Sequence, residues 1–115
     1  EHTAIKFYRH GHVAVDKDGR KFRHDALMID PSRSSLLPDL LWRPPEVAPF
    51  ELGDGEPLKL RIFIDTSVVE VFANGRQCLT LRVYPGREDS VGVSIRAQGS
   101  DAVLRSIDAW QMKGI

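Results

Sequence analysis

The sequence predicts an all-β protein, an antiparallel sandwich or barrel. In most segments apolar residues alternate with polar ones, as in strands that bury one face. No segment of the 115 residues has sustained helical periodicity. Turn-forming residues interrupt the alternating segments every 8–12 residues or so, roughly the spacing found in sandwiches and barrels. These three observations together predict an all-β fold and leave the sandwich and the barrel open.

The clearest strands are expected in the second half of the chain. Asn74-Gly75 lies between two alternating segments, and both residues tolerate the positive φ of a type I′ turn. A two-residue hairpin is therefore expected at this dipeptide. Strands are expected at 58–65, 69–73, 79–84, 91–97 and 102–112.

The first half is less regular. A turn is expected at Asp16–Gly19, where the residues favour tight backbone reversal. Residues 31–57 contain all but one of the seven prolines, which argues against a central strand or a long helix. This segment is expected to be a long loop. Short strands are expected at 4–8, 12–16 and 26–30.

Composition excludes several classes of protein. A chain of this length fits one domain, expected to span residues 1–115. The 16 basic and 16 acidic side chains balance, so there is no general electrostatic case for binding nucleic acid or an anionic membrane. No apolar run approaches the roughly 18 residues of a membrane span, and no signal peptide is evident. Because the sequence begins with Glu1 rather than Met, it is expected to be a piece of a longer protein.

Cys78 is the only cysteine of the chain. An intramolecular disulfide and a zinc site of the multi-cysteine kind are both excluded. The cellular compartment stays open, because many secreted domains also lack disulfides. Cys78 itself is expected to be a small buried residue, since no His-Asp pair marks it as a nucleophile.

The stretch from Leu60 to Gly75 reads as a strand ending in Asp65, a turn, and a strand with Glu70-Val71-Phe72 before Asn-Gly. It resembles the signature of the C-terminal β-sandwich module of glycoside hydrolase family 32, which contains invertases, levanases and inulinases. The resemblance implies an antiparallel β-sandwich of two sheets, concanavalin-like or jelly-roll-like. It also implies a parent enzyme that hydrolyses sucrose or fructans. Three flanking stretches agree in order, at 29–35, 80–85 and 109–112.

The family's catalytic motifs do not occur in the sequence. Members carry their chemistry on an N-terminal β-propeller, through Asp-Pro-Asn-Gly, Arg-Asp-Pro and Glu-Cys motifs. Here Asp30-Pro31 follows Ile29, and Cys78 follows Gln77. The resemblance therefore implies a non-catalytic module that packs against the propeller of the same polypeptide, stabilises it, and shapes its cleft or an oligomer interface. The alternative is a free-standing lectin-like domain that binds carbohydrate.

The resembled module carries one or more strands before the segment that matches residues 3–8. The sequence is therefore expected to be truncated at its N-terminus. A missing strand leaves an unpaired sheet edge, which is a template for pairing with another copy. Self-association is accordingly expected of the isolated piece.

Asp65 and Glu70 are the candidate carboxylate pair. Retaining glycosidases need two carboxyl groups about 5–5.5 Å apart. The two residues have opposite parity along the strands, which argues against a shared cleft. Asp65 is expected instead to accept backbone N–H bonds in the following turn, and Glu70 to pair with Arg61 or Arg82 across the sheet. No catalytic residue and no cofactor is therefore expected in this chain.

His10 and His12 are expected on one strand face, which is a geometry that can hold zinc. A third ligand is not evident, because His2 and His24 have no fixed place in the predicted fold. Two exposed imidazoles are therefore favoured over a metal site.

The two tryptophans have different expected roles. Trp42 lies in the long loop, followed by Arg43-Pro44-Pro45. It is expected either to contact a sugar or a partner domain, or to plug one end of the sandwich. Trp110 alternates within the last expected strand and is predicted to belong to the core.

Overall fold

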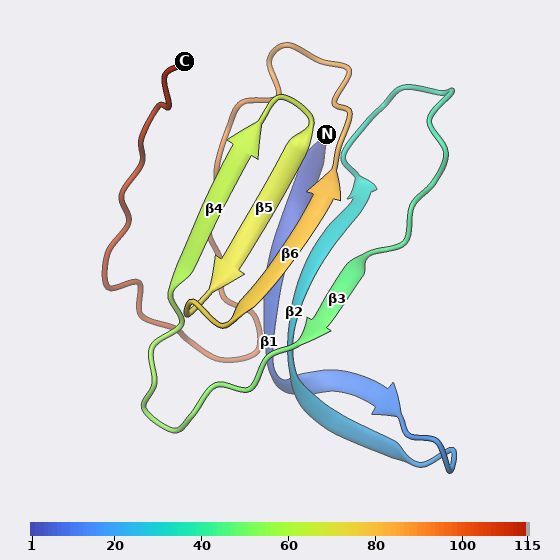
Figure 1. Cartoon of the computed structure of the whole chain (residues 1–115), viewed down its shortest axis with the longest axis vertical. Helices are drawn as coiled ribbons and strands as arrows, with labels where there is room; N and C mark the ends of the chain where they lie inside the picture. Colours follow the sequence, from blue (N-terminus) through green and yellow to red (C-terminus); the bar gives the residue numbers. More distant parts are fainter. Residues whose placement is uncertain (115) are drawn as a thin grey trace.

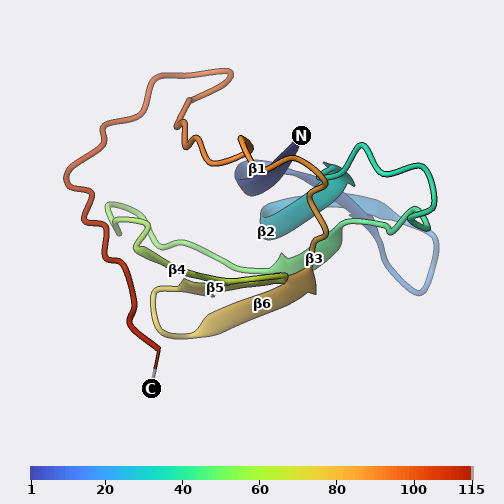
Figure 2. The ribbon, with the colours of Figure 1, turned by 90° about the horizontal axis from the view of Figure 1, so that it is seen from above.

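The computed structural model describes residues 1–114, which form two three-stranded antiparallel sheets and contain no helix (Figure 1). Seen from above, the sheets lie in two layers (Figure 2). The predicted all-β sandwich is confirmed. The first sheet has the order β1-β2-β3 and the second β4-β5-β6, and their bounds are β1 (His2–Val15), β2 (Lys21–Arg33), β3 (Glu46–Pro49), β4 (Leu60–Asp65), β5 (Val68–Ala73) and β6 (Gln77–Arg82).

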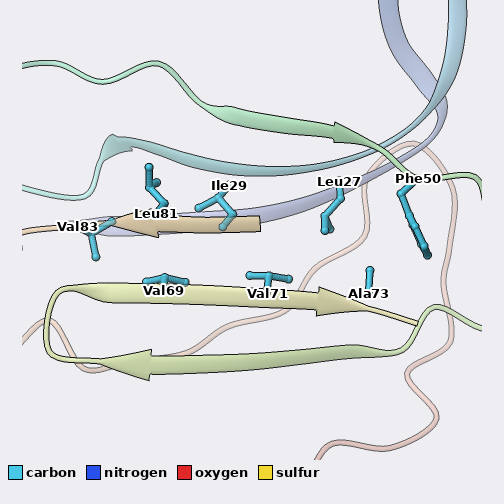
Figure 3. Packing of buried hydrophobic residues seen from close by; sticks show 8 residues of the cluster. All are labelled: Leu27, Ile29, Phe50, Val69, Val71, Ala73, Leu81 and Val83. Carbon is cyan, nitrogen blue, oxygen red and sulfur yellow. The ribbon is translucent and has the colours of Figure 1, made fainter. Parts of the chain in front are cut away.

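The core lies between the two layers. Val69 and Val71 of β5 point toward the first sheet, and Leu27 and Ile29 of β2 meet them (Figure 3). This follows from the period of two, because every second side chain of a strand lies on the same face. The buried cluster consists of Leu27, Ile29, Phe50, Val69, Val71, Ala73, Leu81 and Val83.

The hairpin between β5 and β6 forms at the predicted dipeptide. Asn74 and Gly75 have φ values of 50° and 67°, and the N–H of Arg76 donates to the Ala73 carbonyl at 3.1 Å. The prediction of a two-residue connection was wrong, however. Ala73 pairs with Gln77, so three residues lie between the strands.

The β1–β2 hairpin is longer than the sequence suggested. Instead of two strands at 4–8 and 12–16, one strand runs through both, with a register shift between Tyr8 and His12. The irregularity bends the hairpin, and its distal half (residues 12–24, below called the arm) projects from the sandwich (Figure 1). The expected turn forms at the tip of the arm, where the N–H of Gly19 donates to the Asp16 carbonyl at 3.1 Å.

The proline-rich segment is mostly loop, as predicted, with two exceptions. Residues 31–33 continue β2, and β3 forms at 46–49 and pairs with β2 as an edge strand. An edge tolerates Pro49, since proline cannot donate a ladder hydrogen bond.

The strands expected at 91–97 and 102–112 do not form. Residues 83–114 contain no strand, and Trp110 is 81% exposed, so its predicted place in the core was wrong. Alternation gives a stable strand only where a neighbouring strand pairs with it and an apolar layer covers it. In residues 1–114 no helix is long and apolar enough to cross a membrane.

One row of apolar side chains on the second sheet is only partly covered by the residues that the structure describes. Leu60, Ile62 and Ile64 pair with buried residues of β5, so they share its core-facing side. They are nevertheless 39%, 43% and 64% exposed. The first sheet contacts the second mainly through β2 and β3 against β6, which leaves β4 beyond its reach. We call these three side chains the β4 strip.

Candidate functional site

Asp65 and Glu70 lie on one face of the second sheet, its outer face. Asp65 pairs with Val68, and Val68 and Glu70 alternate with buried Val69 along β5. The expectation from parity was wrong, because the chain reverses direction between the two strands. The two carboxylates are nevertheless diagonal neighbours on an open sheet face rather than partners across a cleft.

The contacts expected for these carboxylates do not form. Asp65 accepts a hydrogen bond from the Thr66 hydroxyl at 3.4 Å, in place of the backbone cap that was predicted. Within residues 1–114, Glu70 forms no ion pair with Arg61 or Arg82; its cross-strand neighbours are Phe63 and Thr80. Both arginines are exposed and lie diagonally across the ladder from Glu70, a position in which backbones are about 7–8 Å apart.

An open groove of about 640 Å³ lies beside the β5–β6 hairpin. Among the described residues that line it, only Glu56 carries a carboxylate, which accepts two hydrogen bonds from Arg76, at 2.8 and 2.7 Å. These bonds, with one from the Gly53 N–H, lower the pKa of Glu56 to about 2. Glu56 is therefore ionised at neutral pH and cannot supply the proton that glycoside hydrolysis requires. The groove is lined by Glu56, Pro57, Lys59, Leu60, Arg61, Phe63, Phe72, Asn74, Gly75 and Arg76.

Arg76 fastens this wall of the groove to the core. Its guanidinium lies 4.8 Å from the centre of the buried Phe50 ring and donates to the Glu51 carbonyl at 2.8 Å. Planar stacking on an aromatic ring and paired hydrogen bonds to a carboxylate are both typical of arginine. The arrangement accounts for Arg76 and Glu56 as structural residues.

Asp25 is a buried charged residue that the sequence analysis missed. Its side chain is 0% exposed and receives hydrogen bonds from three directions. Arg9 donates at 2.7 Å, the His10 N–H at 2.7 Å and the Leu52 N–H at 3.0 Å. Asp25 lies opposite the irregularity in β1, so one carboxylate joins the bend, β2 and the loop after β3.

Burial and hydrogen bonding act in opposite directions on the pKa of Asp25. Desolvation raises it, but the hydrogen bonds from the Leu52 and His10 N–H groups and the charge of Arg9 outweigh that effect, so the pKa is lowered. Asp30 behaves likewise: its hydrogen bonds with Ser32 and Lys6 lower its pKa to about 2. Both side chains are therefore ionised in the folded protein at neutral pH.

These shifts predict loss of stability in acid. The folded-state pKa values of Asp25 and Asp30 are lower than those of the unfolded chain, about 3.9. The contribution of these two carboxylates to the free energy of unfolding is therefore complete above about pH 5 and is lost as the pH falls from about 4 toward 2. Urea midpoints followed by circular dichroism should be level from pH 7 to 5 and fall below 4. The fall should be shallower in Asp30→Asn, and a level midpoint down to pH 3 would contradict the assignment.

The histidines are not arranged as predicted. At His10 the backbone has a φ of 52°, and the ring Nδ1 lies 3.2 Å from Asp25 Oδ1. His12 instead faces His24, with 3.1 Å between Nδ1 of the first and Nε2 of the second. The expectation that His10 and His12 share a face was wrong, because the irregularity in β1 lies between them. Residues 1–114 hold no group of three or more side chains suited to a metal ion.

Cys78 and Trp42 are both exposed. Cys78 lies on the outer face of β6 opposite Phe72, so the prediction that it is buried was wrong. Trp42 is 72% exposed, which excludes the plug and leaves contact with a sugar or a partner. The guanidinium of Arg43 lies over the Tyr84 ring, 5.5 Å from its centre.

Comparison with known proteins points to a single family. The family model described as the C-terminal region of glycosyl hydrolases family 32 matches residues 1–111. A cell-wall beta-fructofuranosidase of Zea mays is 36% identical over 98% of this chain and 19% of its own length. A 6(G)-fructosyltransferase of Asparagus officinalis is 37% identical over 97% and 18%. A raffinose invertase of Escherichia coli is 46% identical over 54% and 13%.

The chain thus spans less than a fifth of the length of these relatives. The family match covers nearly the whole chain, including both sheets and the segment after β6. The chain belongs to the family of C-terminal domains of family 32 glycosyl hydrolases.

Proposed function

We propose that this chain is the non-catalytic C-terminal module of an enzyme that hydrolyses sucrose or fructans. In this proposal the module stabilises the catalytic propeller of the same polypeptide. The relatives are named for fructofuranosidase, fructosyltransferase and invertase activities, and more than four fifths of their length lies outside the matched region. In this proposal the catalytic groups lie in the part of the polypeptide that this chain does not span.

The observation that carries the proposal is the exposed β4 strip. Apolar side chains on the core-facing side of a sheet are normally covered, and a contiguous exposed group of them is typical of an interaction surface. Ile64 is 64% exposed although it pairs with the buried Val69. A catalytic domain packed against this strip would explain both why these side chains are exposed in the isolated chain and why apolar residues alternate along β4. The carboxylates add support, since Asp65 and Glu70 lie on an open face and Glu56 is held as an ion by Arg76.

The test compares two exposed apolar residues in the full-length enzyme. Ile64→Asp on the strip should lower its melting temperature, because a charge would be buried against the catalytic domain. Val15→Asp is the matched control: Val15 is 62% exposed but lies on the arm. Equal effects of both substitutions would argue against the strip as the contact.

The isolated chain supplies the second half of the test. It should release no fructose from sucrose, inulin or levan, because within residues 1–114 no proton donor faces a carboxylate across a cleft. Fructose release that is abolished by Glu70→Gln, with an unchanged melting temperature, would refute the non-catalytic assignment.

The exposed Trp42 favours a second candidate, a lectin-like domain. Aromatic rings stack on sugar rings, and a large exposed aromatic side chain is typical of a contact surface. Quenching of tryptophan fluorescence by inulin that disappears in Trp42→Ala would support this candidate. Absence of quenching would leave the accessory module as the function.

A further inference from the structure

Two histidines from neighbouring strands meet at the base of the arm. His12 of β1 and His24 of β2 are directly paired in the sheet register. Their rings lie nearly perpendicular, at 81°, and 3.1 Å separates Nδ1 of His12 from Nε2 of His24. Both side chains are half-buried, so the facing nitrogens are held by the sheet yet remain within reach of solvent.

The surrounding hydrogen bonds fix the tautomer of His24. Its Nδ1 lies 2.8 Å from the carbonyl oxygen of Asp25. A carbonyl oxygen only accepts, so Nδ1 of His24 carries the hydrogen and donates it. In the neutral ring, Nε2 of His24 is then a bare lone pair directed at His12. A backbone carbonyl that orients an imidazole in this way is the usual outer partner of a metal-binding histidine.

The spacing of the two nitrogens fits a single metal ion. At metal–nitrogen distances near 2.0–2.1 Å, two ligands lie about 2.9 Å apart at a 90° angle and about 3.3 Å apart at the tetrahedral angle. The observed 3.1 Å falls between these values. We propose that His12 Nδ1 and His24 Nε2 form a two-imidazole site for a divalent first-row transition metal, with water completing the coordination.

The neighbours of the pair are suited to this role. Tyr8 and Phe22 flank it on the same face, with ring centres 5.9 Å from His12 and 5.6 Å from His24 respectively. These rings limit how far the imidazoles can turn. Because His24 is bonded to the carbonyl of Asp25, a bound metal would join the arm to the buried polar centre of the sandwich. The sequence predicts His10 and His12 on one face with no evident third ligand; the irregularity in β1 brings His24 to His12 instead.

Copper is the sharpest probe, since imidazole suits Cu²⁺ and electron paramagnetic resonance reports bound nitrogens. A free amino group next to His2 would itself bind Cu²⁺, so every measurement uses the full chain carrying His2→Gln. This protein should bind one Cu²⁺ through two imidazole nitrogens, and its melting temperature should rise with Cu²⁺ concentration. His12→Gln and His24→Gln should each weaken binding by at least about tenfold and abolish the rise.

His10→Gln is the matched control, because His10 lies on the same strand and contacts Asp25 without facing the pair. It should leave the copper affinity unchanged. Circular dichroism verifies the fold of each variant, and His12→Gln leaves the His24–Asp25 bond in place should His24→Gln fail to fold. The site is refuted by binding that survives in folded His12→Gln, by equal loss in His10→Gln, or by no binding in the folded parent.

Discussion

Asp25→Ala is expected to lower the free energy of unfolding by about 3–5 kcal/mol. The substitution leaves the Leu52 and His10 N–H groups and the Arg9 guanidinium without the carboxylate that they share. Donors that lose a buried charged partner cost more than donors on the surface, because water replaces the lost bonds less completely. A loss of this size is a large part of the roughly 5–15 kcal/mol that keeps a domain folded.

Asp54→Ala is the matched control for Asp25→Ala. Asp54 also contacts Arg9, at 3.5 Å, but its side chain is fully exposed. Exposed ion pairs contribute little, so this variant should stay within about 0.5 kcal/mol of the parent. Urea denaturation at pH 7 measures both. Comparable losses in the free energy of unfolding would show that the buried Asp25 carboxylate contributes no more than the exposed Asp54 carboxylate.

Leu27→Ala should cost about 2–5 kcal/mol, through lost burial and the cavity left behind. Leu27 is 0% exposed and lies between the sheets, beside Phe50 (Figure 3). Leu41→Ala makes the same chemical change in a side chain that is 88% exposed, and it should be nearly neutral. Urea denaturation of both variants measures the difference. If both variants unfolded at the same urea concentration, the core would not lie where the two sheets meet.

The sequence was most informative where structure is local. The alternation before and after Asn74-Gly75 predicted β5, β6 and the turn, because the φ preferences of two residues suffice to reverse the chain. It misled at 91–97 and 102–112, where the same alternation has no neighbouring strand in the structure. Periodicity indicates which side of a strand is apolar, but it carries no information on which surface will cover that side.

The hydrogen bonds of Asp25 and the contact between His12 and His24 could not be predicted, because the residues that meet are distant in sequence. Asp25 accepts hydrogen bonds from residues 16 and 27 positions away, Arg9 and Leu52. His12 meets His24 only because extra residues in β1 shift the register of the hairpin. No local pattern in the sequence marks that shift. When this register shift is left out, the alternation of side chains along the strands places each histidine beside the wrong neighbour.

The two sheets differ in the length of chain that must close to form them. In the second sheet, two residues connect β4 to β5 and three connect β5 to β6, whereas β2 and β3 are separated by residues 34–45. Short loops close faster and at a lower entropic cost. We expect the second sheet to assemble first during refolding and the sandwich to close later. In the interval Val69 and Val71 face water, so yield should fall as the protein concentration during refolding rises, even where the finished fold is stable.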